Sequence, residues 1–161
     1  MRWRQAAANG KAARRQRSRS ALTLTIQGQQ QFVDLPARTT LRRWLARALP
    51  GAALVTLRFV DTHEGRKLNR TYRRRDHATN VLTFDYERSP VVQADIVICV
   101  PVARREARAQ GKPLRHHLAH LVLHGALHAA GHDHLRARDA QIMEALEVAL
   151  LQRLRIPNPY N

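Results

Sequence analysis

The chain has 161 residues, of which 44% are hydrophobic, so it can bury one core and wholesale disorder is not expected. No run of about eighteen apolar residues predicts a membrane-spanning helix, and no apolar signal segment follows the basic start. The single cysteine, Cys99, cannot form an internal disulfide, which favours a reducing, cytoplasmic location.

The chain is strongly basic: it has 28 Lys and Arg residues against 12 Asp and Glu residues, which gives a formal net charge of +16. Lys and Arg bind polyphosphates by releasing their counterions, even without reading a base sequence. The alternatives are a basic surface without function and a surface that binds anionic membranes. We favour a nucleic-acid partner and no membrane.

Residues 1–20 carry seven basic side chains and no acid, which leaves +9 on the remaining 141 residues. Their mixture of Ala, Gln, Ser and Arg predicts a disordered arm without catalytic importance, followed by a single domain over residues 21–161. The arm could instead help to hold RNA, be a translation-start extension, or be a transit peptide that directs the chain to an organelle.

In chain order, the first predicted element is a strand at residues 22–26, where apolar residues alternate with threonines. Thr39 and Thr40 are predicted to cap a short helix over residues 41–49, which ends before a Pro-Gly pair. Alternation returns at residues 53–61 and predicts a second strand.

The polar stretch 63–75 predicts a helix, and two β-branched runs at 81–86 and 96–100 predict adjacent strands, as in a hairpin. Helical spacing then predicts three helices, at residues 102–110, 114–130 and 136–154. The whole order predicts an α+β (α/β-like) single domain with a small mixed four-stranded sheet and about five helices.

Seven of the nine histidines lie between residues 116 and 134. His124 and His128 are four residues apart on a predicted helix, so their rings lie on one face within reach of a common ion. His120 is on the same stripe, but it lies about 12 Å from His128 along the helix axis. Three turns of one straight helix cannot easily converge on an ion with bonds near 2 Å, so a third ligand must come from elsewhere.

Gly131 supplies a turn that ends the helix, because glycine tolerates the left-handed conformation of such turns. His134 has enough chain after this turn to fold over the helix face, and His132 is the weaker candidate. The pattern predicts one transition-metal ion, most simply zinc. A histidine-rich helix without a metal is the alternative.

Three neutral imidazoles leave a fourth position open for water, as in catalytic rather than structural zinc sites. Asp133 or another carboxylate could orient a ligand. In H-E-x-x-H metallopeptidases a glutamate follows the first histidine, but here that position is Gly125, which disfavours peptide hydrolysis by that mechanism.

The stretch HGALHAAGHDH at residues 124–134 resembles the signature H-G-x-L-H-x-x-G-[HY]-D-H of the bacterial YbeY family, the rRNA maturation factors. A second stretch, LNRTYRRRD at 68–76 followed by TNVLTF at 79–84, is similar to the family's L-N-x-x-Y-R-x-x-D-x-x-T-[DN]-V-L-S-F. The resemblance covers about residues 53–160. The sequence departs from the family's usual residues at four positions: Ala78, Thr83, Asp85 and Ala94.

The resemblance implies a zinc-dependent endoribonuclease that prefers single strands and acts in ribosomal RNA maturation, at the 3′ end of the small-subunit rRNA, and in ribosome quality control. It implies one Zn²⁺ per chain, held by His124, His128 and His134 on a C-terminal helix and the turn after it. The implied partners are ribosomal RNA, the small ribosomal subunit, and ribosomal proteins or an assembly GTPase.

The family's functional arginine corresponds to Arg73, so Arg73 and His124 are the expected catalytic residues. A guanidinium pairs with two phosphate oxygens at once and could hold the scissile phosphate while water or a nucleic-acid hydroxyl attacks. Arg70, Arg74 and Arg75 are expected to position phosphates. The sequence identifies no general base. Two rival functions remain: an assembly factor with a mainly structural zinc, and a hydrolase of another small substrate.

Overall fold

The computed structural model describes residues 21–161, so the predicted arm at 1–20 lies outside the described residues. Four strands form one sheet: β1 (Leu22–Gln27), β2 (Ala53–Val60), β3 (Val81–Glu87) and β4 (Val92–Cys99). Their spatial order is β1-β2-β4-β3, with β1, β2 and β4 parallel and β3 antiparallel to β4. The sheet is therefore mixed, and the predicted neighbouring strands β3 and β4 do pair.

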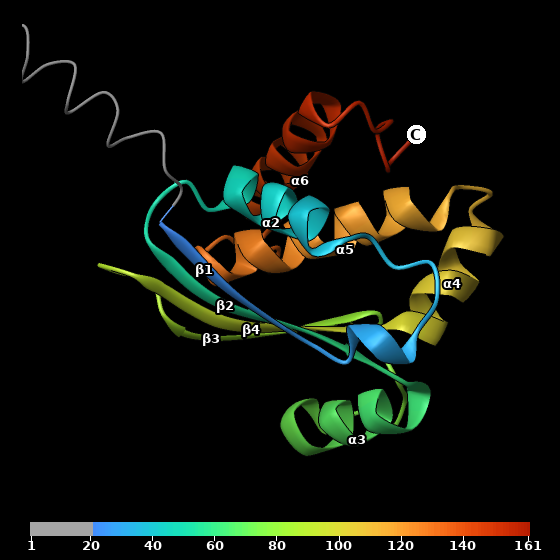
Figure 1. Cartoon of the computed structure of the whole chain (residues 1–161). Helices are drawn as coiled ribbons and strands as arrows, with labels where there is room; N and C mark the ends of the chain where they lie inside the picture. The colour runs from blue at the N-terminus through green and yellow to red at the C-terminus, as the bar shows by residue number, and fades with distance from the viewer. Residues whose placement is uncertain (1–20) are drawn as a thin grey trace, which may run out of the picture.

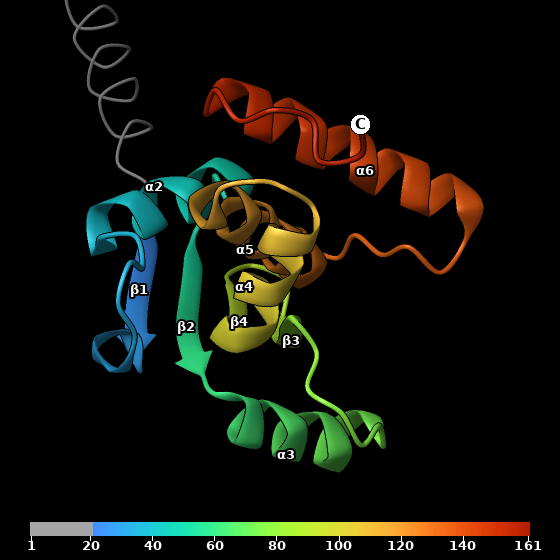
Figure 2. The ribbon, with the colours of Figure 1, turned by 90° about the vertical axis from the view of Figure 1, so that its right-hand side faces the viewer.

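Five α-helices cover this sheet in the described residues: α2 (Arg38–Ala48), α3 (Thr62–Arg73), α4 (Val100–Ala109), α5 (Leu114–Ala129) and α6 (Ala137–Arg153). A short 3₁₀ helix, η1 (Gln29–Gln31), follows β1. Helices α2, α5 and α6 lie on one side of the sheet and α3 lies on the other (Figures 1 and 2). The predicted single α+β domain is confirmed.

The main hydrophobic core lies between the sheet and the helices α2 and α5. Alternate residues of β2 face this core, with Val55, Leu57 and Phe59 all buried. A smaller cluster on the opposite face of the sheet includes Val60 and Val97. Burial on both faces explains why the second half of β4 is a continuous apolar run rather than an alternating one.

Helix α5 is the central helix of the fold, and ten of its 16 residues are buried. Such a helix packs on several sides at once, here against β3, β4, α2, α4 and α6. The half-buried residues of α5 include His120, His124 and His128, which recur every four residues. The fold thereby leaves one stripe of imidazoles accessible on an otherwise buried helix.

Several boundaries predicted from the sequence were wrong. Thr39 does not cap α2, because the helix begins at Arg38 with Ala37 at its N-cap. The carbonyl of Ala37 accepts from two backbone amides of the first turn, and the Arg38 side chain donates to the carbonyl of Leu24 on β1. Strand β4 starts at Val92, four residues before the predicted start at residue 96, because it pairs with β2 along its whole length. Helix α4 consequently begins at Val100.

Helix α3 starts with a cap that periodicity did not identify. The carboxylate of Asp61 accepts a hydrogen bond at 2.8 Å from the backbone amide of Glu64, so β2 ends and α3 begins within two residues. Among residues 21–161, no helix is long and apolar enough to span a bilayer.

Candidate metal centre

The structure brings the three predicted ligand histidines together. His124 and His128 lie one turn apart on α5 with ring centroids 4.7 Å apart, and His134 lies 4.9 Å from His128 and 5.6 Å from His124. One ligand nitrogen of each residue lies within 4.8 Å of the other two. Three nitrogen donors at this spacing suit a single transition-metal ion such as zinc.

The turn after α5 determines where His134 lies. The amide of His132 donates to the carbonyl of Leu127, and the amide of Gly131 donates to that of His128, with Gly131 at φ 102°. This hydrogen-bond pair is the Schellman motif, which ends a helix and reverses the chain. The reversal returns His134 to the exposed side of α5, whereas His132 lines the same cleft outside the three-residue group.

The protonation state of His128 suits a metal ligand. Burial lowers its pKa to about 4, and its neighbours His124 and His134 act in the same direction. A metal binds the neutral imidazole, so this environment favours the ligand form of His128 at neutral pH. The residues present therefore fit the metal that the sequence predicts.

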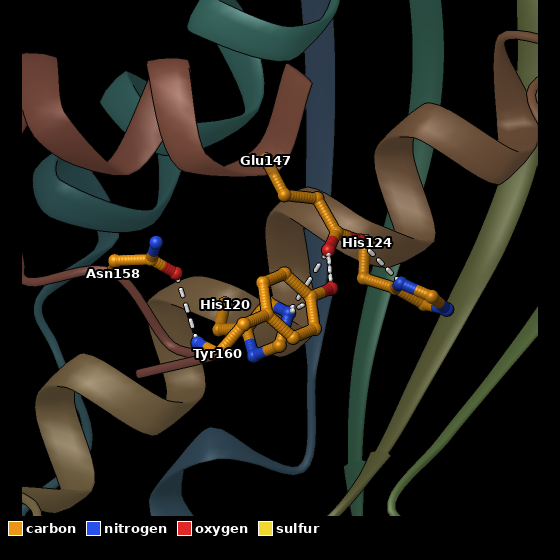
Figure 3. Close-up of polar contacts among 5 residues, drawn as sticks. All are labelled: His120, His124, Glu147, Asn158 and Tyr160. Atoms are coloured by element: carbon orange, nitrogen blue, oxygen red, sulfur yellow. Dashed lines mark hydrogen bonds and ion pairs between the residues drawn. The ribbon is translucent and has the colours of Figure 1, made fainter. Parts of the chain in front are cut away.

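A buried carboxylate orients His124, and it comes from α6. The Nδ1 atom of His124 is hydrogen-bonded to Oε1 of Glu147, whose side chain is fully buried (Figure 3). This bond leaves Nε2 of His124 as the ring nitrogen available to an ion. Asp133, which the sequence analysis considered for this role, instead accepts from the backbone amide of Leu135 at 3.2 Å.

Glu147 also bonds two further groups. Its Oε2 atom lies 3.1 Å from Nε2 of His120 and accepts from the hydroxyl of Tyr160. Burial alone would raise the pKa of this carboxyl, but the hydrogen bonds from His120, His124 and Tyr160 outweigh burial and lower it to about 2. Glu147 is therefore a carboxylate at neutral pH. No sequence motif distinguished it from the other acids of α6.

The three histidines line one side of a cleft of about 770 Å³. Arg73 and Arg75, at the end of α3 and just after it, also line this cleft, whereas Arg70 and Arg74 do not. The sequence-predicted arginines thus divide into two that share a cavity with the histidines and two that lie outside it.

Arg88 is a cleft residue that sequence reasoning missed. It follows β3, forms an ion pair with Asp85 at 2.7 Å, and lies against Gly131, where an added Cβ would meet its Cδ at 3.4 Å. Both Arg88 and Asp85 line the cleft, so a cation is present on the β3 side as well as the α3 side. Arg88 lies in the connection between β3 and β4, which contains no recognised motif, so the sequence did not indicate that it faces the cleft.

Asn69 fixes the backbone that carries the cleft arginines. Its side chain is buried, and its amide nitrogen donates to the carbonyl of His77 at 2.7 Å. The carbonyl of Asn69 accepts from the amide of Arg75. These bonds hold residues 74–77 against α3, so that Arg73 and Arg75 reach the cleft.

The chain is similar to known proteins of one family. A family model described as "Endoribonuclease YbeY" matches residues 25–155. Curated relatives of that name include one from Polaromonas sp., 58% identical over 76% of this chain and 80% of its own length. Another, from Thiobacillus denitrificans, is 51% identical over 87% of this chain and 97% of its own.

A solved structure has the same fold. The solution structure of TM1509 from Thermotoga maritima superposes with a TM-score of 0.54 at 23% sequence identity, covering 83% of this chain and 92% of that one. At this identity the match concerns the fold alone.

Proposed function

Since this chain belongs to the endoribonuclease YbeY family, we propose that it is a zinc-dependent endoribonuclease that prefers single-stranded RNA and processes ribosomal RNA. The single observation that carries the proposal is the cleft in which His124, His128 and His134 share one cavity with Arg73. Nitrogen ligands can hold a metal ion that acts as a Lewis acid, and a guanidinium can bind the phosphate, so the cleft suits metal-dependent phosphodiester cleavage.

The proposed roles follow from position. Arg73 binds the non-bridging oxygens of the scissile phosphate with its planar fork and stabilises their charge as the bond breaks. Arg75 and Arg88 contact phosphates on either side. Glu147 keeps His124 in the tautomer that presents Nε2. A bound zinc ion supplies a Lewis acid at this site.

The proposal extends to place and partners. We propose that the chain acts on the RNA of the small ribosomal subunit, at the 3′ end of its rRNA, during maturation and quality control. The net charge of +16 supports binding to RNA in general. Ribosomal proteins or an assembly GTPase are the further partners we propose. A cytoplasmic location is supported by Cys99, which is buried and free.

The first test compares the wild type with His124→Ala. Zinc content is measured by elemental analysis, and both proteins are incubated with single-stranded and structured ribosomal RNA. We expect one zinc per wild-type chain and loss of both zinc and cleavage in the variant. His116→Ala is the matched control, because His116 lies on the same helix outside the three-residue group.

Equal cleavage by wild type and His124→Ala would overturn the nuclease assignment, since it would indicate a contaminating enzyme. Zinc in the wild type without cleavage of either RNA would instead favour the rival function, an assembly factor whose zinc is mainly structural. Circular dichroism of the metal-free variants checks that they fold.

A further inference from the structure

The segment after α6 returns to the metal side of α5. Helix α6 ends with Arg155 in the left-handed conformation and with the amide of Ile156 donating to the carbonyl of Leu151, which reverses the chain. Ile156 is buried and anchors this reversal in the core. The chain then reaches Tyr160, whose ring lies beside His120 of α5 with centroids 5.5 Å apart (Figure 3).

A local turn aims Tyr160 at Glu147. The Oδ1 atom of Asn158 accepts from the backbone amide of Tyr160 at 2.9 Å, closing an Asx turn. The hydroxyl of Tyr160 then donates to Oε2 of Glu147, thirteen residues earlier in the chain. Figure 3 shows this hydroxyl and the ring of His124 on the same carboxylate.

Glu147 has no freedom to turn while these contacts hold. Its side chain is fully buried, its Oε1 atom faces His124, and its Oε2 atom faces His120 and Tyr160. A buried carboxylate oxygen that lacks a hydrogen-bond donor raises the free energy of the folded state. Glu147 is therefore expected to rotate or move when one of its donors is lost. Any such movement also moves the acceptor that sets the tautomer and ring orientation of His124.

We propose that Tyr160 is a positioning residue for the metal site, acting through Glu147 on His124. The inference rests on the proposed metal site and adds the segment after α6 to its support. Burial and the bond to Glu147 raise the pKa of Tyr160 above its usual range, so the phenol remains a donor.

One other arrangement uses the same atoms. His120, His124 and Glu147 also place ligand atoms within 4.8 Å of one another and could form a second metal site. His124 would then serve two ions at once, one through each ring nitrogen. The hydrogen bonds of Glu147 favour its role as a partner that orients His124. The number of metal ions bound per chain distinguishes this role from that of a ligand.

The test measures zinc affinity of the metal-free, full-length protein by competition with a chromophoric chelator, without RNA. Tyr160→Phe removes only the hydroxyl, and we expect zinc binding about twofold to tenfold weaker, as removal of one hydrogen bond allows. Glu147→Gln should weaken binding about 10- to 100-fold, as changes to groups that orient metal ligands do. The visible spectrum of the Co²⁺-loaded protein should change in both variants.

Tyr86→Phe is the matched control. The Tyr86 hydroxyl also donates to a carboxylate, that of Asp95 at 2.8 Å, but outside the cleft. The Tyr86→Phe variant should keep the zinc affinity and the Co²⁺ spectrum of the wild type. If Tyr160→Phe does not fold without metal, Asn158→Ala should weaken zinc binding in its place. It removes the turn that aims Tyr160 and a bond to the exposed Asn161, and it leaves Glu147 and Tyr160 themselves unchanged.

Each other outcome contradicts a distinct claim. Wild-type affinity and spectrum in Tyr160→Phe would overturn the positioning role while leaving the metal site intact. Two zinc ions per wild-type chain would make Glu147 and His120 ligands, which also overturns the inference. No zinc binding by the wild type would overturn the proposed function itself.

Discussion

Gly125 is the residue that allows α5 to approach the sheet. A Cβ at this position would lie 2.8 Å from Cγ2 of Ile96 and 3.1 Å from Oγ1 of Thr83, so even one added carbon requires a shift. The same position carries the general base in H-E-x-x-H peptidases. A glutamate side chain here would collide with Ile96 and Thr83 of the sheet. The structure thus gives a steric reason, in addition to the missing carboxylate, why peptide hydrolysis by the H-E-x-x-H mechanism is disfavoured.

We predict that Gly125→Ala lowers the free energy of unfolding. Overpacking costs about 1–3 kcal/mol, and the better helix propensity of alanine returns at most about 1 kcal/mol. Chemical denaturation of the metal-free protein measures the net change. Gly51→Ala is the control, because an added Cβ there meets nothing within 4 Å. Unchanged or increased stability of Gly125→Ala would show that Ile96 and Thr83 yield without cost.

Helix α3 and the turn after it position the arginines that line the cleft. Its Asp61 cap fixes where it starts, and the Asn69 bond to His77 fixes the turn where it ends. Arg70 and Arg73 lie on the last turn of α3, whereas Arg74 is its C-cap in the left-handed conformation and Arg75 follows it. Arg73 and Arg75 line the cleft, and Arg70 and Arg74 do not.

This division predicts different effects for neighbouring arginines. Arg73→Ala should lower the cleavage rate at saturating single-stranded RNA by about 10²- to 10³-fold, as removal of a donor to a developing oxyanion does. Arg70→Ala, the control on the same helix, should change that rate by less than about threefold, since an exposed charge mainly affects association. If Arg73→Ala leaves both RNA affinity and cleavage unchanged, the proposed role of Arg73 is wrong.

The charge of the whole molecule acts over a longer range than any single side chain in the cleft. Residues 21–161 keep +9 of the total +16 when the seven basic side chains of residues 1–20 are discounted. Such a field raises the local concentration of RNA and weakens with salt. It contributes to binding without selecting a cleavage site.

We therefore predict that a chain lacking residues 1–20 keeps its cleavage rate at saturating RNA but binds RNA more weakly. The logarithm of its affinity should fall less steeply with the logarithm of salt concentration, by about 0.7 for each phosphate that the shortened chain no longer neutralises. Fluorescence anisotropy with labelled single-stranded RNA measures both slopes. A large decrease in turnover would instead assign the first 20 residues a part in the chemistry.

Much of the candidate centre could be predicted because its determinants are local. His124 and His128 are four residues apart on one helix, and Gly131 allows the turn that brings His134 back within ten residues of His124. Strand alternation and helical spacing likewise predicted the sheet and its five helices. The short 3₁₀ helix η1 was missed, as were boundaries set by side-chain and backbone hydrogen bonds, such as those at Arg38 and Val92.

The sequence by itself determined the histidine group, the basic charge and the order of strands and helices, since each depends on residue type and short spacing. Tertiary structure alone decided that Glu147 of α6 and Tyr160 support His124, and that Arg88 faces the same cleft as Arg73. The physical reason is that these interactions join segments far apart in the chain. Their distances are set by how α5 packs against α6 and the sheet, which no local pattern encodes.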